Sequence, residues 1–339
     1  MEHRLLGRSG LIVSRLALGT MTFGHETDPA GAFAQLDAYV EAGGNFVDTA
    51  DVYSHGASEE IIGDWLAQRP GVRDGLVVAT KGRFGMHRHP NGAGLSRRHL
   101  AEALDASLRR LRVDAVDLYQ LHSWDPLTPI EEYLRFVDDA VSLGKVHYFG
   151  LSNFTGWQLA AVTERARQHG WTQPVSLQPQ YNLLTRWIEF ELTPACAEYG
   201  LGMIPWSPLA GGWLAGKYSP DEVPSGATRL GENPARGMEG YARRNTASTW
   251  EVLKVVSEVA EAAGLTMAQV ALAWLADRPQ VVAPILGNRT LEQLRGSLAV
   301  ADLHLDAAAT ARLDEVSAPS VPDYPYGELG RDQRNRELP

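Results

Sequence analysis

The sequence predicts a (β/α)₈ barrel (TIM barrel), in which eight parallel strands close into a ring and a helix follows each strand, with a β-hairpin at the N-terminus. Short apolar runs alternate with segments of helical period through residues 16–300, and eight such pairs can be counted. The chain has 339 residues, 44% of them hydrophobic, which is enough for such a barrel with insertions. Strict alternation implies parallel strands joined by helices, and eight strands favour closure over an open, doubly wound sheet. We expect one domain over residues 1–330 and a flexible tail over 331–339.

Turn residues and the spacing of apolar residues predict the strands and helices in order along the chain. Ser9 and Gly10 lie between two short apolar runs and predict the hairpin within residues 4–13. The expected strands, each with the helix after it, are 16–19 with 28–42, 45–48 with 58–66, 76–81 with 96–111, 115–122 with 129–143, 146–153 with 155–169, 174–180 with 189–199, 202–209 with 247–263 and 281–287 with 290–300. A further helix is expected at 266–277, before the last strand.

Residues 45–66 contain a strand, a loop and a helix in immediate succession, with two reactive side chains at the junction. Asp48 closes the strand and Tyr53 lies just beyond it. Ser58 is expected to cap the helix, and two glutamates follow in its first turn, where the helix dipole favours negative charge. Taken alone, Asp48 could be a strand-end cap and Tyr53 an ordinary loop aromatic.

Composition excludes several classes of partner. The net charge of -10 and the pI near 5.5, without a concentrated block of Lys and Arg, argue against nucleic acid or an anionic membrane as the main partner. Cys196 is the only cysteine, so an internal disulfide and a Cys-built zinc site are excluded. The N-terminus lacks the apolar core of a signal peptide, and no apolar run approaches the about 18 residues that span a bilayer. We expect a cytoplasmic protein.

Barrel enzymes carry their catalytic residues at the C-terminal ends of the strands. A charged or hydrogen-bonding group ends nearly every strand here: Asp48 with Tyr53 beyond it, Lys81, His122, Ser152 with Asn153, Gln178, Trp206 with Ser207, and Gly287. Singly, Lys81 could be a snorkelling cation, His122 a core histidine and Trp206 a packing residue. Together they indicate a site, because a lysine beside an aspartate stays charged and lowers the pKa of a neighbouring phenol. A tyrosine that acts as a general acid needs that environment.

These features resemble the catalytic tetrad of the aldo-keto reductases, with D-x-x-x-x-Y at 48–53, a strand-ending Lys81 and L-H at 121–122. The resemblance covers most of the chain and includes the motifs GTMTFG (19–24), SEEIIG (58–63), GLSNF (150–154), LQPQYN (177–182), PWSPLAGG (205–212) and PILGNRTLEQL (284–294). It implies NADPH-dependent reduction of an aldehyde or ketone, a small-molecule carbonyl substrate, to an alcohol. Tyr53 would donate the proton, and Lys81, paired with Asp48, would adjust the pKa of Tyr53. His122 would hold the carbonyl oxygen of the substrate.

The resemblance also implies the residues that bind the cofactor. Ser152, Asn153 and Gln178 match residues that hold the nicotinamide carboxamide, and Trp206 matches the aromatic that stacks on its ring. Ser297 stands where relatives commonly have an asparagine facing the adenine. The full set that the resemblance implies is Gly19, Thr20, Met21, Asp48, Ser152, Asn153, Gln178, Trp206, Ser207, Pro208, Leu209, Gly211, Gly287, Arg289, Gln293 and Ser297.

A phosphate site at the helix after strand eight is supported by the residues themselves. Helix N-termini bind phosphate, and barrels place such sites at this corner. Thr290 and Gln293 have capping-box spacing, and Arg289 could pair with a ribose 2′-phosphate, with Arg295 as the alternative. The Gly-rich segment 210–246 follows strand seven and is expected to close over the cofactor as a lid. Its cations expected near a pyrophosphate are Lys217, Arg229, Arg243 and Arg244.

Two weaker features and two rival functions stay open. The His-Arg-His stretch at 87–89 is expected to be a solvated loop, and no metal site is predicted. Phe84, Trp124 and Trp213 follow catalytic strand ends and either line an apolar substrate pocket or simply pack. The chain could instead act as a dehydrogenase in the oxidative direction, or as an NADPH-binding regulatory subunit of a membrane channel. The sequence predicts neither the particular substrate nor the oligomeric state.

Overall fold

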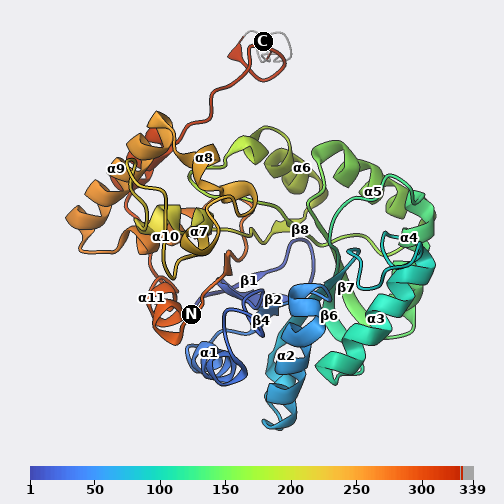
Figure 1. Ribbon diagram of the computed structural model, residues 1–339. Helices are drawn as coiled ribbons and strands as arrows, with labels where there is room; N and C mark the ends of the chain where they lie inside the picture. The colour runs from blue at the N-terminus through green and yellow to red at the C-terminus, as the bar shows by residue number, and fades with distance from the viewer. Residues whose placement is uncertain (329, 331–339) are drawn as a thin grey trace.

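A ring of eight parallel strands forms the centre of the protein in the computed structural model, which describes residues 1–328 and 330 (Figure 1). The strands are β3 (Ala17–Gly19), β4 (Phe46–Asp48), β5 (Val77–Gly82), β6 (Val116–Leu121), β7 (Val146–Ser152), β8 (Ser176–Gln178), β9 (Gly202–Met203) and β10 (Ile285–Leu286), paired in this order, with β10 also beside β3. A parallel bridge from Met203 to Val281 joins the β9 and β10 segments, and the N–H of Val282 donates to the carbonyl of Met203 at 2.8 Å. The ring is therefore closed, which confirms the predicted barrel. The tail expected at 331–339 lies outside the described residues.

Helices cover the outside of the ring (Figure 1). They are α1 (Pro29–Glu41), α2 (Ala57–Ala67), α3 (Arg97–Leu111), α4 (Ile130–Ser142), α5 (Gly156–His169), α6 (Leu192–Tyr199), α9 (Ala247–Ala263), α10 (Met267–Ala276), α11 (Leu291–Leu298) and α12 (Ala307–Val316). Short 3₁₀ helices lie between them: η1 (Tyr53–Gly56), η2 (Arg73–Gly75), η3 (Trp187–Phe190), η4 (Ala210–Ala215) and η5 (Gly237–Glu239). The large helices follow the predicted positions because their apolar residues recur at helical spacing, as in α3, where Leu100, Leu104, Leu108 and Leu111 are buried.

The last two predicted strands are the most shortened, and a helix after α11 was not expected. The predicted strands 202–209 and 281–287 contain only β9 and β10, of two residues each. Proline has no backbone N–H to donate to a neighbouring strand, and Pro205 and Pro284 interrupt these segments. Helix α12 begins after Asp306, whose side chain accepts a hydrogen bond from the N–H of Ala309.

The expected N-cap of α2 is wrong. Gly56 caps this helix in a left-handed conformation with φ of 96°, and Ser58 lies inside the first turn, fully buried. The hydroxyl of Ser58 donates to the carbonyl of Thr20 at 2.9 Å and lies 3.0 Å from the hydroxyl of Thr49. Ser58 therefore connects the start of α2 to the loops that follow β3 and β4, instead of satisfying a free N–H of its own helix.

The N-terminal hairpin forms as predicted from β1 (His3–Leu5) and β2 (Ile12–Ser14), which pair antiparallel. Leu6 and Val13 of the hairpin belong to the apolar cluster inside the ring, with Phe46, Val77 and Leu118. Figure 1 shows the hairpin lying across the middle of the ring. Since these strand residues precede the C-terminal ends, the hairpin covers the N-terminal end of the barrel.

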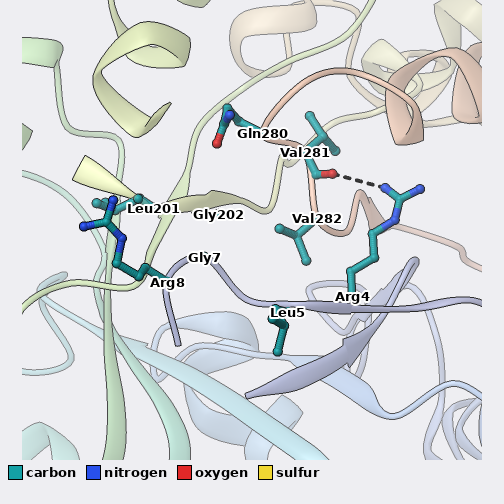
Figure 2. A pocket seen from close by; sticks show the side chains of 10 residues that line it. Arg4, Leu5, Gly7, Arg8, Leu201, Gly202, Gln280, Val281 and Val282 are labelled. Atoms are coloured by element: carbon teal, nitrogen blue, oxygen red, sulfur yellow. Dashed lines mark hydrogen bonds between the residues drawn. The ribbon is translucent and has the colours of Figure 1, made fainter. Parts of the chain in front are cut away.

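A cavity of about 380 Å³ lies beside the hairpin, between residues that precede or begin β9 and β10 (Figure 2). Arg4, Leu5 and Arg8 line it from the hairpin side, with Leu201 and Val282 across from them. The guanidinium of Arg4 donates to the carbonyl of Val281 at 3.2 Å. This cavity is at the N-terminal end of the barrel, opposite to the end where the predicted catalytic residues lie.

Among the described residues no single helix is long and apolar enough to cross a membrane, and only α9 and α10, bent by 97°, pass that test as a pair.

A buried arginine connects the hairpin to the last helices of the barrel. The side chain of Arg15 is fully buried, and one guanidinium nitrogen donates to the carbonyl of Val300 at 2.7 Å. The other donates to Asp277 at 2.7 Å and to the carbonyl of Leu303 at 2.9 Å. Arg15 therefore joins the carboxylate of Asp277, just after α10, to backbone carbonyls just beyond the end of α11.

We predict that Arg15→Ala lowers the free energy of unfolding by about 3 to 5 kcal/mol, because Asp277 and the carbonyls lose a buried partner. Denaturant or thermal unfolding followed by circular dichroism measures the change. Arg98→Ala is the matched control: among the residues that the structure describes, Arg98 pairs only with Glu102 on the surface of α3, so its loss should cost less than about 1 kcal/mol. Equal stability of the two variants would contradict the role of Arg15.

Candidate active site

The alternation of side chains along the strands places the predicted residues on one surface. Side chains two residues apart on a strand point to the same face. Phe46, Ala79 and Leu118 form part of the apolar cluster inside the ring. Two residues later on the same strands stand Asp48, Lys81 and a residue that the sequence analysis did not select, Gln120. These three side chains therefore face the interior at its C-terminal end, and His122 follows Gln120 at the same spacing.

Lys81 and Asp48 form a buried ion pair at this end. The ammonium of Lys81 lies 2.6 Å from the Asp48 carboxylate, and the exposed fractions of the two side chains are 0% and 2%. The ammonium also donates to the carbonyl of Thr49 at 2.7 Å and to the hydroxyl of Tyr53 at 3.2 Å. The structure thus brings Asp48, Lys81 and Tyr53 into direct contact, as predicted.

The second carboxylate oxygen of Asp48 is also fully engaged. The side-chain amides of Gln120 and Gln178 each donate to it at 2.9 Å, and Gln178 donates to the oxygen of Gln120 at 3.0 Å. Sequence reasoning missed Gln120, although a buried amide at even spacing before His122 in an apolar strand was a usable signal. Gln178 was expected to hold a cofactor amide, and here its amide nitrogen is directed to Asp48.

A tight turn brings Tyr53 over the ammonium. Ser54 and His55 both adopt left-handed conformations, with φ of 49° and 54°, which non-glycine residues rarely do. The hydroxyl of Ser54 donates to the carbonyl of Phe23 at 2.7 Å and fixes the turn against the loop after β3. The Tyr53 ring lies 5.9 Å from the His122 ring in an edge-on arrangement.

Burial is the largest single influence on the pKa of both the phenol and the ammonium, but it decides the direction of the shift only for the phenol. It raises the pKa of Tyr53 above its usual value, and the charge of Lys81 offsets this only in part. The ammonium lowers the pKa of Tyr53 as predicted, but desolvation outweighs it and the net shift is upward. Burial also opposes the charge on Lys81, but Asp48 and Tyr53 outweigh it and raise the pKa of Lys81. At neutral pH the site holds a protonated phenol beside a charged ammonium.

His122 is a neutral imidazole. Burial, followed by the charges of Lys81 and Arg83, holds the pKa of His122 well below its usual value. Its Nδ1 is buried and has no hydrogen-bond partner within the described residues. The Phe84 ring packs 4.7 Å from the imidazole. The fourth predicted residue, His122, therefore lies between the rings of Tyr53 and Phe84.

The polar groups at the ends of the next strands bind one another. The Ser152 hydroxyl donates to the carbonyl of Gln178 at 3.1 Å. The Asn153 side chain donates to the carbonyl of His122 at 3.0 Å, and its oxygen accepts from the indole of Trp206 at 3.0 Å. These contacts join the ends of β6, β7 and β8 to the segment after β9. The structure brings these predicted residues together, and their contacts with a cofactor stay predictions.

Segment 210–246 folds over the same end of the barrel and contains two further helices, α7 (Arg229–Glu232) and α8 (Tyr241–Arg244). Its buried Glu239 accepts from Ser207 at 3.2 Å, from Gln180 and from Arg244 at 2.7 Å. Arg244 also donates to the carbonyl of Leu184 at 2.6 Å. One predicted phosphate cation, Arg244, is therefore engaged inside the protein.

Arg289 lies where the lid meets the start of α11. Its guanidinium contacts Glu232 of α7 at 2.6 Å and Glu26 of the loop after β3 at 3.0 Å. Arg236 of the lid also contacts Glu26, at 2.6 Å. Arg229 forms no ion pair within the described chain, although Arg236, Arg289 and Glu26 all influence its pKa, which burial lowers. Arg236 of the lid and Arg289 just before α11 thus share one buried carboxylate, and Arg229 is close enough to feel its charge.

The capping prediction for α11 holds in part. Thr290 caps the helix and accepts from the N–H of Gln293 at 3.2 Å. The Gln293 side chain accepts from the N–H of Arg289 at 3.0 Å, and not from Thr290 as a capping box requires. The Ser297 hydroxyl, expected to face an adenine, donates to the Asn288 side chain at 3.1 Å.

The other predicted residues lie around this end of the barrel. Gly19 pairs with Asp48, and the N–H of Thr20 donates to the carbonyl of Asp48 at 3.0 Å. Gly211 adopts a left-handed φ of 67° against Glu239. Met21 is 40% exposed and Gly287 borders open space. Pro208 and Leu209 belong to the turn between β9 and η4.

The pocket candidates separate into two groups. Phe84 contacts His122 and so lies beside the site, whereas Trp124 packs edge-on against Phe154 and Trp157. Trp213 is fully buried inside the lid and donates its indole N–H to the carbonyl of Glu239 at 3.0 Å, so it cannot line a pocket. In the described part of the chain no three His, Cys, Asp or Glu side chains are arranged to hold a metal ion.

Comparisons with known proteins agree with this geometry. The family model described as "Aldo/keto reductase family" matches residues 15–318. The chain is 38% identical to the uncharacterized oxidoreductase YrpG of Bacillus subtilis (strain 168), over 93% of this chain and 96% of that protein. It is 37% identical to a probable voltage-gated potassium channel subunit beta of Oryza sativa subsp. japonica, over 87% and 90%. It is 34% identical to versiconal hemiacetal acetate reductase of Aspergillus parasiticus, over 95% and 98%. The chain therefore belongs to the aldo/keto reductase family.

Proposed function

We propose that the protein is an oxidoreductase that uses NADPH to reduce an aldehyde or ketone to an alcohol, with Tyr53 as the proton donor. The observation that carries this proposal is the position of the Lys81 ammonium, 2.6 Å from Asp48 and 3.2 Å from the Tyr53 hydroxyl. The neutral His122 on the other side of Tyr53 adds a second group for the carbonyl oxygen. The oxidoreductases among the relatives support the same reaction class.

The residues at the mouth of the barrel fit a phosphate-bearing nicotinamide cofactor. Arg229, Arg236 and Arg289 form a cationic cluster beside the N-terminus of α11, where a phosphate is favoured. The buried amide nitrogen of Asn288 has no partner within the described residues and faces the same corner as Ser297. These residues would hold the phosphates and the adenosine, and Ser152, Asn153 and Trp206 would hold the nicotinamide end.

The chain's own residues supply positioning and one proton. When bound, the nicotinamide supplies the hydride. Tyr53 donates its hydroxyl proton to the carbonyl oxygen, because burial keeps the phenol protonated until a negative charge develops beside it. The Lys81 ammonium then stabilises the phenolate that remains, and it cannot leave because Asp48 and Thr49 hold it. The outer nitrogen of the neutral His122 donates a hydrogen bond to the same oxygen.

We predict that Tyr53→Phe keeps NADPH binding and lowers carbonyl reduction by about 10²- to 10⁴-fold, because only the proton donor is lost and the ring still packs. NADPH oxidation with a panel of aldehydes and ketones measures the rate, and fluorescence titration measures cofactor binding. Lys81→Met should reduce the rate comparably. A Tyr53→Phe enzyme that keeps most of the wild-type rate would contradict the mechanism.

We predict that Arg289→Ala raises KM for NADPH by about ten- to a hundredfold and leaves kcat near its original value, because a charge-assisted contact remote from the reacting carbon is lost. NADH kinetics should change little, since NADH lacks the 2′-phosphate. Steady-state kinetics with both cofactors, run in parallel on Arg289→Ala and Arg295→Ala, separate the two candidate cations.

The matched control is Glu232→Gln, which breaks the ion pair between α7 and Arg289 but keeps the arginine. If Arg289 acts mainly by fastening the lid, both variants should weaken NADPH and NADH binding alike. If it binds the 2′-phosphate, Glu232→Gln should not raise KM for NADPH. Equal losses with both cofactors in Arg289→Ala would show that this arginine supports the lid or the shared pyrophosphate instead.

A second candidate function is that of a cofactor-binding subunit that assembles with a membrane channel and turns over little substrate. The observation that favours it is the similarity to proteins named as probable voltage-gated potassium channel subunits beta. The full tetrad is compatible with both functions. Co-purification from membranes, compared between wild type and Tyr53→Phe, separates them: a stable channel partner with negligible turnover supports the second function.

A further inference from the structure

A second group of ionisable side chains lies behind the tetrad, on the outer side of β5 and β6. Thr80 and Tyr119 each stand one residue before an interior residue, so their side chains point outward, toward α2 and α3. Asp51 and Glu59 lie in this layer, and Asp51, Glu59 and Tyr119 have exposed fractions of 0%, 0% and 1%. The proposed reaction makes no use of them.

Glu59 is fully paired within this layer. One of its carboxylate oxygens accepts from the hydroxyl of Thr80 at 2.5 Å. The other accepts from the guanidinium of Arg110 at 2.7 Å, and the ion pair has the same length. Glu59 is therefore a fixed negative charge, held between α2, α3 and β5.

Asp51, in contrast, is buried without a side-chain partner among the described residues. Neither carboxylate oxygen accepts a hydrogen bond of ordinary geometry there, although the adjacent N–H of Val52 favours the ionised form. The backbone N–H of Asp51 donates to the carbonyl of Lys81 at 3.1 Å, which fixes it in the loop between Asp48 and Tyr53. Such a carboxyl is costly when ionised, and because buried polar groups without partners are rare, its presence requires an explanation.

Burial and the charge of Glu59 oppose the ionised form of Asp51. Burial, and after it the charge of Glu59, raises the pKa of Asp51 to about 7. Arg110 of α3 and Lys81 of β5 act in the opposite direction. The hydroxyl of Tyr119 on β6 also has no partner among the described residues. Asp51 in turn raises the pKa of Tyr119 and, more weakly, that of Tyr53.

We propose that Asp51 is a positioning residue that acts through Tyr53: this buried carboxyl is neutral while Tyr53 donates its proton, and it weakens that donation when it ionises. The inference rests on the proposed function, in which Tyr53 is the acid. The physical reason is that a negative charge added beside a buried phenol makes the phenolate less stable, so the phenol becomes a weaker acid.

The test is the pH dependence of kcat/KM for carbonyl reduction. In the wild-type enzyme the rate should fall about three- to tenfold as pH rises through about 7, where Asp51 loses its proton. Asp51→Asn keeps the shape and stays neutral, so this step should disappear and the high rate should persist above it. A step that survives unchanged in Asp51→Asn would overturn the proposal.

Two neighbours allow a matched pair of variants that move the step in opposite directions. Glu59→Gln removes the negative charge that opposes ionisation, so the step should move to lower pH. Arg110→Met removes a positive charge that favours ionisation, so the step should move to higher pH. A purely structural role of this layer would alter the overall rate without shifting the step. Shifts in the same direction, or no shift in either variant, would overturn the proposal.

Infrared difference spectroscopy tests the carboxyl without any substrate. Wild-type protein should show a protonated-carboxyl band that vanishes as pH rises through about 7, and Asp51→Asn should lack it. A titrating band with parallel pH profiles for wild type and Asp51→Asn would overturn the effect on Tyr53 and leave the proposed reduction intact. Absence of turnover with every carbonyl compound, with the band present, would overturn the proposed function itself.

Discussion

The buried ion pair between Lys81 and Asp48 is the interaction on which the rest of the site depends. Without its partner, either side chain would lose its charge inside the barrel or would destabilise the fold around it. Lys81 and Asp48 therefore require each other. The pair also requires further hydrogen bonds, and the structure provides them from Thr49, Gln120 and Gln178. Side chains and a carbonyl at the ends of β4, β5, β6 and β8 therefore meet at the Asp48 carboxylate and the Lys81 ammonium. These hydrogen bonds satisfy both oxygens of the Asp48 carboxylate, which favours this single arrangement of the four side chains.

The same ion pair defines two layers of different character on either side of β5. Toward the interior stand the ammonium and the phenol, where a positive charge is fixed and burial keeps Tyr53 protonated. Toward the helices stand Glu59 and Asp51, where a negative charge is fixed and a second carboxyl resists ionisation. Only the backbone of β5 separates the two layers. The charge state of the outer layer therefore influences the phenol through protein of low dielectric constant.

Segment 210–246, the expected lid, adds a second constraint at the C-terminal end of the barrel. Arg289 and Arg236 share the carboxylate of Glu26, and Glu232 attaches α7 to Arg289. In the proposed function a phosphate that reaches Arg289 competes with two carboxylates of the chain itself. Cofactor binding and the position of the lid are then linked, because the same guanidinium serves both. This linkage gives the long insertion a role that a merely solvated loop would not have.

The sequence by itself determined the barrel, the hairpin and the residues of the tetrad, because alternating periods fix the element order and parallel strands gather their C-terminal ends. Local signals failed where tertiary contacts decided: Ser58 binds Thr20 instead of capping α2, and Trp213 is buried in the lid. Only the tertiary structure added Gln120, which contacts Asp48 from 72 residues away. It alone also set the direction of the Tyr53 pKa, since burial outweighs the neighbouring ammonium. The burial of a side chain depends on packing from the whole fold, so a local pattern of residues cannot predict it.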